Sequence, residues 1–281
     1  MMVSAAFRGR RGAAERRELF LWLACLLLAN QILRVPASSL SGFIDGLLPA
    51  LASKSAFYYL GWYAVLRLLF HSGREAAPSA ADIAFALAIA TLNFLPDYNA
   101  SWVSATAVGI CLLTTNQGDR KLRAAGVVLL ALAVNGLWGP FFFDVFAIQL
   151  LRVDAALVGA ALSLTQPNVS WHETVIEPTD GPSLFIAPPC SSFHNVSLAL
   201  LCWVSLNRLC RTRWMASDTL IALAVAGAVI LLNGCRLYLM AMSPSSLAYW
   251  HEGFGEEIFA WTTTFVVLVI SLWGAVRKGR T

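Results

Sequence analysis

The sequence has few charged residues. Asp, Glu, Lys and Arg make up 13% of its 281 residues, whereas a soluble domain carries about 25%. Hydrophobic residues make up 58%, and the mean hydropathy is +0.67. These proportions exclude an ordinary soluble domain and indicate a membrane protein with several spans. The net charge of +4 does not indicate nucleic-acid binding, because the basic residues gather at the ends of apolar runs.

Several motifs that would suggest a particular chemistry are also missing. The six cysteines form no CxxC pair, so neither a disulfide framework nor a zinc knuckle is indicated. The sequence has no Walker motif and no dinucleotide-binding glycine pattern, and it therefore suggests no cofactor.

The apolar runs predict an all-α polytopic membrane protein with about eight transmembrane helices. The predicted spans cover residues 19–33, 55–70, 80–95, 102–115, 124–138, 193–209, 219–239 and 258–276. A cleaved signal peptide is the alternative for the first run, but no clear A-x-A cleavage site follows it. Asp144, Arg152 and Asp154 interrupt residues 141–164. They favour an amphipathic helix at the outer interface, or a re-entrant segment, over a further crossing.

Four regions follow from these runs: a basic cytoplasmic N-terminus (1–18), a five-span N-terminal bundle (19–140), an outer amphipathic helix with a small β-hairpin (141–189), and a three-span region with a basic tail (190–281), which the residues described below suggest is the catalytic region. Alternation in residues 169–176, an Asp180–Gly181 turn and a return strand at 183–186 predict the hairpin. With eight crossings, 16 of the 20 Lys and Arg residues lie inside. The positive-inside rule then places the hairpin outside, in the periplasm if this is a bacterial inner membrane.

Cys190 differs from the other cysteines in its flanking residues. Pro188 and Pro189 block helix formation before it, and Ser191 and Ser192 can cap the helical run that follows. Cys190 is therefore predicted at or just before a helix N-terminus, where the helix dipole favours a thiolate. The alternative is that Cys190, like most cysteines in apolar chains, is an inert small hydrophobic residue.

Two further side chains are predicted at the same outer level. Arg236 follows Asp218, at the inner end of its span, by 18 residues, which is about 27 Å of helix and nearly the whole hydrocarbon thickness. Asn233 shares its helix face. His251 lies in an outer loop predicted over residues 243–255. The alternatives are an arginine that reaches to lipid headgroups and a histidine beside interfacial aromatic residues.

Together these residues suggest a thiol nucleophile. Cys190 would attack, the Arg236 charge would stabilise an anion, and His251 would carry the proton. His194, four residues after Cys190, competes for the role of base. A metal site built from Cys190, His172, His194 and Glu252 is a further alternative. HExxH itself is not present, because Gly255 stands in place of the second histidine.

These motifs resemble the exosortase/archaeosortase family of membrane-embedded cysteine transpeptidases. The resemblance rests on Cys190–Ser191 at the start of a span, on Asn233-x-x-Arg236 in the next span, and on His251 before the last one. It implies that Cys190 is the acyl-enzyme nucleophile, Arg236 an electrostatic stabiliser and His251 the acid/base. Ser192 replaces the glycine that usually follows Cys-Ser in the family, which indicates a divergent Cys-Ser-Ser subfamily.

The resemblance also implies the partners. The substrates would be exported proteins whose C-terminal tail, of the PEP-CTERM type, carries a short motif, a hydrophobic helix and a basic cluster. Membrane lipid is the other expected partner, and nucleic acid is not expected. The alternative function is a transporter or assembly factor for envelope polysaccharide, in which Arg236, Glu252, Glu256 and Glu257 line a path.

Overall fold

The fold is taken from a computed structural model of the chain, in which residues 15–33, 49, 51–52, 54–73, 77–95, 97–115, 118–179 and 181–277 are described. Most of the predicted basic N-terminus (1–18) lies outside these residues. The helices are α1 (Arg16–Leu33), α3 (Ala56–Phe70), α4 (Ala80–Asn93), α5 (Tyr98–Thr115), α6 (Arg120–Ala133), α7 (Gly139–Ser163), α8 (Ser192–Cys210), α9 (Ala216–Met242), α10 (Pro244–His251) and α11 (Phe254–Arg277).

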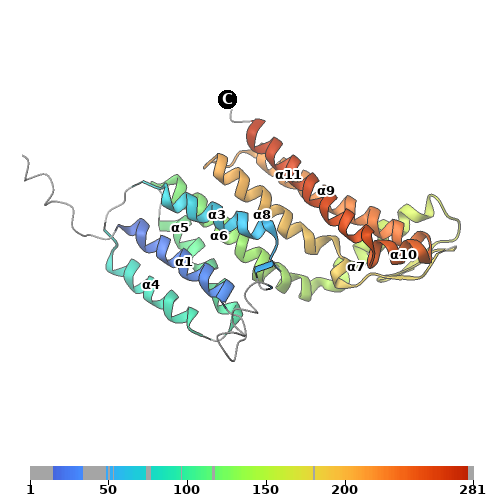
Figure 1. Cartoon of the computed structure of the whole chain (residues 1–281), viewed down its shortest axis with the longest axis horizontal. Helices are drawn as coiled ribbons and strands as arrows, with labels where there is room; N and C mark the ends of the chain where they lie inside the picture. Colours follow the sequence, from blue (N-terminus) through green and yellow to red (C-terminus); the bar gives the residue numbers. More distant parts are fainter. Residues whose placement is uncertain are drawn as a thin grey trace, which may run out of the picture.

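The first five described helices, α1 and α3 to α6, pack around one apolar core, seen at the left of Figure 1. Trp62, Leu112 and Leu129 are among its fully or almost fully buried side chains. Short polar residues cap several of these helices. For example, the Asp119 carboxylate accepts hydrogen bonds from the first backbone N–H groups of α6. Apolar runs and caps therefore explain where this bundle begins and ends.

Helix α6 continues into α7 through a five-residue π-helical segment, Val134–Trp138. The ring of Trp102 lies against Gly136, where an added Cβ would come within 2.3 Å of it. The helix predicted at 141–164 is present as α7, but the predicted limit at residue 140 falls inside a continuous helix. A kink at Phe146 bends α7. Its exposed side chains include Phe141, Phe142 and Ile148, which indicates contact with lipid chains.

Helices α8, α9 and α11 form a second bundle, and α8 also packs against α3 and α6. Trp203 and Val267 are fully buried between these helices. By length and composition, three helical segments could cross a membrane: Arg120–Ser163, Ala216–Met242 and Phe254–Arg277. Shorter apolar helices cover Ala56–Phe70, Ala80–Asn93 and Asn195–Cys210. The helical membrane fold is therefore confirmed, whereas the predicted number of eight spans is not.

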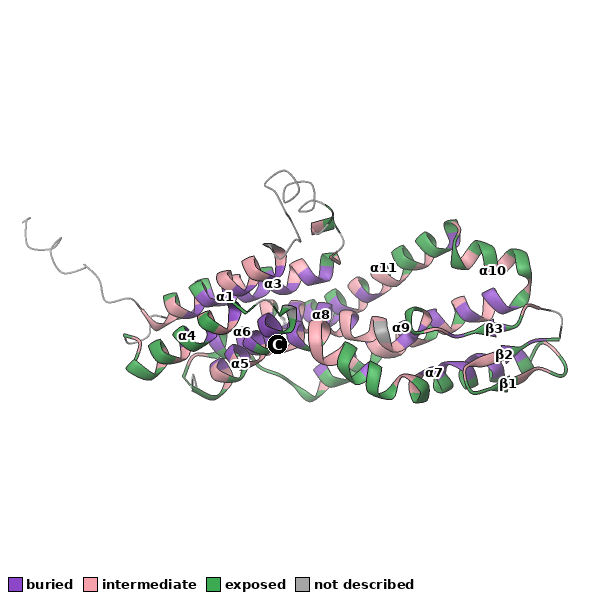
Figure 2. Ribbon diagram, turned by 90° about the horizontal axis from the view of Figure 1, so that it is seen from below, coloured by how far each residue is buried: buried purple, intermediate pink, exposed green. Residues whose placement is uncertain are grey.

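Many residues on the outer surfaces of the helices are exposed (green in Figure 2), and many of these are large and apolar. Trp22, Leu87, Leu231 and Trp261 are all more than 60% exposed. A soluble monomer rarely exposes so much contiguous apolar surface. These side chains are what a lipid-facing surface requires.

A small sheet follows α7 and packs on it. It contains β1 (Ser170–His172), β2 (Val175–Glu177) and β3 (Leu184–Phe185), in the order β1-β2-β3 with antiparallel pairs. The prediction of a two-stranded hairpin was wrong in one respect. The strand expected over 169–176 turns back on itself at Glu173, whose φ is 55°, and forms β1 and β2. The expected return strand is β3, which pairs with β2.

The predicted outer loop over 243–255 was also wrong, because it contains helix α10. Ser243 caps this helix through a hydrogen bond from Ser246 N to Ser243 Oγ (3.1 Å), and Pro244 occupies its first turn. In Figure 1, α10 lies at the end of α9 and α11 that is opposite the C-terminus. The sheet lies at the same end as α10 (Figure 2).

Candidate active site

The turn that carries Cys190 is fixed by its own backbone. Pro188–Cys190 forms one turn of 3₁₀ helix, and Ser191 then takes an extended conformation (φ −70°, ψ 137°) as the N-cap of α8. The Ser191 Oγ accepts a hydrogen bond from Phe193 N. Cys190 thus lies two residues before the first residue of α8. Its side chain is half-buried, and its thiol is free.

A buried carboxylate holds the residues after Cys190. Asp154, on α7, is 2% exposed, and its Oδ2 accepts hydrogen bonds from Ser191 Oγ (2.9 Å) and Ser192 N (3.1 Å). Ser191 and Ser192 are both fully buried. In the sequence, Asp154 is recognisable only as an interruption of an apolar run. An ionisable residue in such a run is by default a functional candidate, and this is the signal in the sequence that points to Asp154.

A buried amide holds the turn from the side of α9. The Asn233 Nδ2 donates hydrogen bonds to the Cys190 carbonyl oxygen (2.7 Å) and to Ser192 Oγ (3.1 Å). Asn233 is 1% exposed. The Cys190 turn is therefore tied to α7 through Asp154 and to α9 through Asn233, which restricts the positions open to the thiol.

Cys190 and His251 border the same cavity, whose volume is about 450 Å³. The cavity lies between β3, the Cys190 turn, the end of α9 and helix α10. Glu252 also lines it, and its carboxylate is 3.6 Å from His251 Nδ1. The His251 side chain is 46% exposed, so water can reach it.

Arg236 lies close to this region but not on the cavity wall. Its Nε donates a hydrogen bond to the carbonyl oxygen of Trp250 (3.0 Å), and its guanidinium carbon lies 5.1 Å from the centre of the Phe259 ring. It is not among the described residues that line the cavity. Because Trp250 directly precedes His251, Arg236 fixes the end of α10 that carries the histidine.

The other predicted residues are less informative. The backbone of His194 belongs to the first turn of α8, but its side chain lies outside the described residues. His172 lies on β1 and is exposed. Within the described part of the chain, no group of three or more His, Cys, Asp or Glu side chains could hold a metal ion. The geometry gives no support to the metal site considered above.

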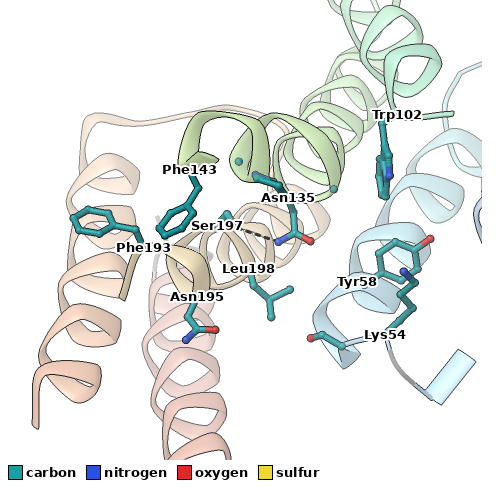
Figure 3. Close-up of a pocket in the computed structure, with 13 residues that line it drawn as sticks. Lys54, Tyr58, Trp102, Asn135, Phe143, Phe193, Asn195, Ser197 and Leu198 are labelled. Atoms are coloured by element: carbon teal, nitrogen blue, oxygen red, sulfur yellow. Dashed lines mark hydrogen bonds between the residues drawn. The ribbon is translucent and has the colours of Figure 1, made fainter. Parts of the chain in front are cut away.

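A second cavity, of about 370 Å³, lies between the N-terminal bundle and α8. Figure 3 shows Lys54, Tyr58, Asn135 and Asn195 around it, with a hydrogen bond of 3.1 Å from Asn135 Nδ2 to Ser197 Oγ. The π-helical segment supplies part of its wall. Neither Cys190 nor His251 lines this cavity.

These observations define an integral membrane protein of helices, with a cysteine and a histidine that border one cavity at one end of the bundle. The family model of the transmembrane exosortases (Exosortase_EpsH) matches residues 3–273, nearly the whole chain. The protein therefore belongs to the transmembrane exosortase family, as the motifs predicted. Membership indicates a membrane transpeptidase-like role and exported proteins as substrates. No curated protein and no solved structure matched the chain.

Proposed function

We propose that this protein is a membrane cysteine peptidase or transpeptidase that cleaves the C-terminal sorting tails of exported proteins. The observation that carries the proposal is the shared cavity of Cys190 and His251. A thiol and an imidazole that face one solvent-accessible space can act on the same peptide bond. The family match supplies the class of substrate.

The reaction has two steps. The Cys190 thiolate attacks the carbonyl carbon of the scissile peptide bond, and the C–N bond then breaks to leave a thioacyl enzyme. His251 gives a proton to the departing amine. In the second step, an acceptor amine or water attacks the thioester, and His251 takes the proton of that acceptor. Transfer and hydrolysis differ only in the acceptor.

The edge strand β3 offers a place for the recognition motif of the tail. Ser183, Leu184 and Phe185 line the cavity beside Cys190. Ile186 N donates a hydrogen bond to Thr174 O (2.9 Å), and alternate residues of an antiparallel strand point their backbone groups to opposite edges. The Phe185 backbone therefore faces away from β2, where an extended peptide could pair with it.

The proposed orientation places this site outside the cytoplasmic membrane. The end of the bundle opposite Cys190 carries Arg208, Arg211, Arg213 and Arg277. Basic residues concentrate on the cytoplasmic side of a membrane protein. Cys190 then faces the periplasm or exterior, where exported substrates arrive.

The test uses an exported reporter protein fused to a C-terminal tail. The tail is taken from a protein encoded in the same genome and carries a short motif, a hydrophobic helix and a basic cluster. We expect Cys190→Ala to abolish removal of the tail and Cys235→Ala to leave it unchanged, because Cys235 is exposed on α9 and lies outside the cavity. A membrane-impermeant maleimide should label Cys190 in intact spheroplasts. Normal processing by Cys190→Ala would refute the peptidase and favour the transporter alternative.

The role of Arg236 needs a separate experiment, since its guanidinium contacts the Trp250 carbonyl rather than the cavity. We propose that Arg236 contributes charge near the reacting carbonyl and holds α10 in place. Arg236→Lys keeps the charge but removes the planar group that reaches both Trp250 and Phe259. If position matters as well as charge, Arg236→Lys should process the reporter much more slowly than the wild type.

A further inference from the structure

A basic cavity of about 610 Å³ lies at the opposite end of the bundle from Cys190. Four arginines line it: Arg120 and Arg123 at the start of α6, Arg208 at the end of α8, and Arg213 in the following loop. Nothing in the proposed reaction uses these residues.

Arg208 is the most informative of the four, because it is only 5% exposed. Its Nη1 donates to the Thr212 carbonyl oxygen (3.1 Å), and its guanidinium carbon lies 5.0 Å from the centre of the Trp214 ring. Its Nε is buried and has no hydrogen-bond partner among the described residues. A buried donor without a partner is costly, and an arginine that lines a cavity can bond to a ligand there.

The charge of the cavity is not balanced by nearby carboxylates. Asp218 is fully buried and close enough to Arg208 to interact electrostatically, and its Oδ2 already accepts a hydrogen bond from Met215 N (2.8 Å). Asp119 caps α6 and lines a neighbouring cavity that includes Lys121. Even two carboxylates beside four guanidinium groups leave a net positive charge.

The start of α6 adds to this charge. Arg120 and Arg123 are three residues apart, lie on the same helix face, and are both exposed. Cations in the first turn of a helix are unfavourable, because that end of the helix dipole is positive. A bound anion would offset both the repulsion between the arginines and their interaction with the dipole.

Apart from Thr212 and the indole of Trp214, the remaining wall of the cavity is apolar. Leu113 and Val127 line it together with Ala124. Val127 follows Arg120 by seven residues, so it lies about 10 Å deeper along α6. The cavity is thus basic at its polar end and apolar toward the middle of the membrane, which matches a phosphate headgroup with attached acyl chains and does not match a free anion.

We propose that this cavity binds the phosphate group of an anionic phospholipid from the leaflet at this end of the bundle. Guanidinium groups bind phosphate oxygens in pairs of parallel hydrogen bonds. Basic pockets between transmembrane helices on the cytoplasmic side bind anionic headgroups in this way. The bound lipid would join α6 to the α8–α9 loop and thereby connect the N-terminal bundle to the helices that carry the Cys190 site.

The test is thermal unfolding of the purified full-length protein in detergent. Phosphatidylglycerol, phosphatidylcholine or inorganic phosphate is added to separate samples of the protein at the same phosphate concentration. We expect a higher unfolding temperature with phosphatidylglycerol only. Native mass spectrometry should show phosphatidylglycerol that stays bound when phosphatidylcholine is lost. No preference for phosphatidylglycerol would overturn the proposal, and an equal effect of inorganic phosphate would overturn its assignment to a lipid.

Variants show whether the effect arises in this cavity. Arg123→Gln with Arg213→Gln changes two exposed residues, so folding should survive, and we expect phosphatidylglycerol to bind about tenfold more weakly or worse. The matched control is Arg277→Gln, at the same end of the bundle but outside the cavity. The proposal fails if the double variant keeps the full temperature shift, or if Arg277→Gln loses as much of it. Arg208→Gln, which alters the buried group, should remove the shift wherever the variant folds.

Discussion

Removal of the Asp154 carboxylate should impair Cys190 without any change to the cysteine. Asp154 lies on α7, far from Cys190 in the sequence, but its Oδ2 accepts hydrogen bonds from Ser191 Oγ and Ser192 N, the two residues directly after the thiol. Asp154 does not line the Cys190 cavity. In the proposed reaction it is therefore a positioning residue, which would act through the backbone of the Cys190 turn.

The magnitude follows from these two bonds. A buried donor left without a partner costs about 1–3 kcal/mol, and a hydrogen bond to a charged group contributes about 1.5–3 kcal/mol. Asp154→Ala leaves Ser192 N, in a fully buried residue, without its acceptor, and it releases Ser191. We expect the ordered conformation of the Cys190 turn to lose at least about 2 kcal/mol of stabilisation. At about 1.4 kcal/mol per factor of ten in rate, this slows tail removal by about 30-fold or more.

Asp154→Asn provides a graded comparison. Both hydrogen bonds end on the same oxygen, Oδ2, so a carboxamide oxygen in that position can still accept both. Only the charge assistance is lost, and the rate should fall less than about tenfold. The rate of tail removal should therefore be highest in the wild type, lower in Asp154→Asn and lowest in Asp154→Ala.

The assay measures tail removal from the exported reporter and, in the same membranes, the rate at which a maleimide labels Cys190. The matched control is Asp144→Ala, on the same helix but exposed. A residue with only a structural role would lower the unfolding temperature without changing how fast the folded protein is labelled. Tail removal at the wild-type rate by Asp154→Ala, or equal impairment of Asp144→Ala, would rule out this role of Asp154.

Two further predictions use the contacts around the same site. Asn233→Asp keeps the size of the side chain but replaces the amide that donates to the Cys190 carbonyl oxygen, so reporter processing should slow by about tenfold or more; unchanged initial rates would contradict this. Gly159→Ala places a Cβ within 2.6 Å of the Trp171 ring, so thermal unfolding in detergent should show a loss of about 1–3 kcal/mol. Gly234→Ala meets nothing within 4 Å and should be neutral or stabilising, and equal effects of the two alanines would contradict the packing argument.

The helices and the start of α8 could be predicted from the sequence because their signals are local. Apolar runs mark the helices, and the proline pair with the following serines marks the Cys190 turn. The signal for α10 was also local, since Ser243 and Pro244 are a cap and a first-turn residue. It is weak because the segment is short and lies between two predicted spans, where a loop is the usual connection.

Other features could not be predicted, because their causes lie far apart in the sequence or leave no typical pattern. The turn between β1 and β2 contains Glu173 at positive φ instead of the Gly or Asn typical of such turns. The contact between Asp154 and Ser191 joins residues 37 positions apart. The contact of Arg236 with the Trp250 carbonyl depends on the presence of α10. Such contacts follow from tertiary packing, which apolar periodicity does not specify.

The contacts of Asn233 and Arg236 give a physical reason for the three-residue spacing between them. Residues three positions apart lie on one face of a helix, about 4.5 Å apart along its axis. From this face of α9, Asn233 binds the Cys190 carbonyl oxygen, and Arg236 binds the carbonyl oxygen of the residue before His251. Contacts from a single helix therefore hold both the Cys190 turn and the end of α10 that carries His251. The spacing of Asn233 and Arg236 therefore links both residues to Cys190 and His251, although neither Asn233 nor Arg236 lines the cavity.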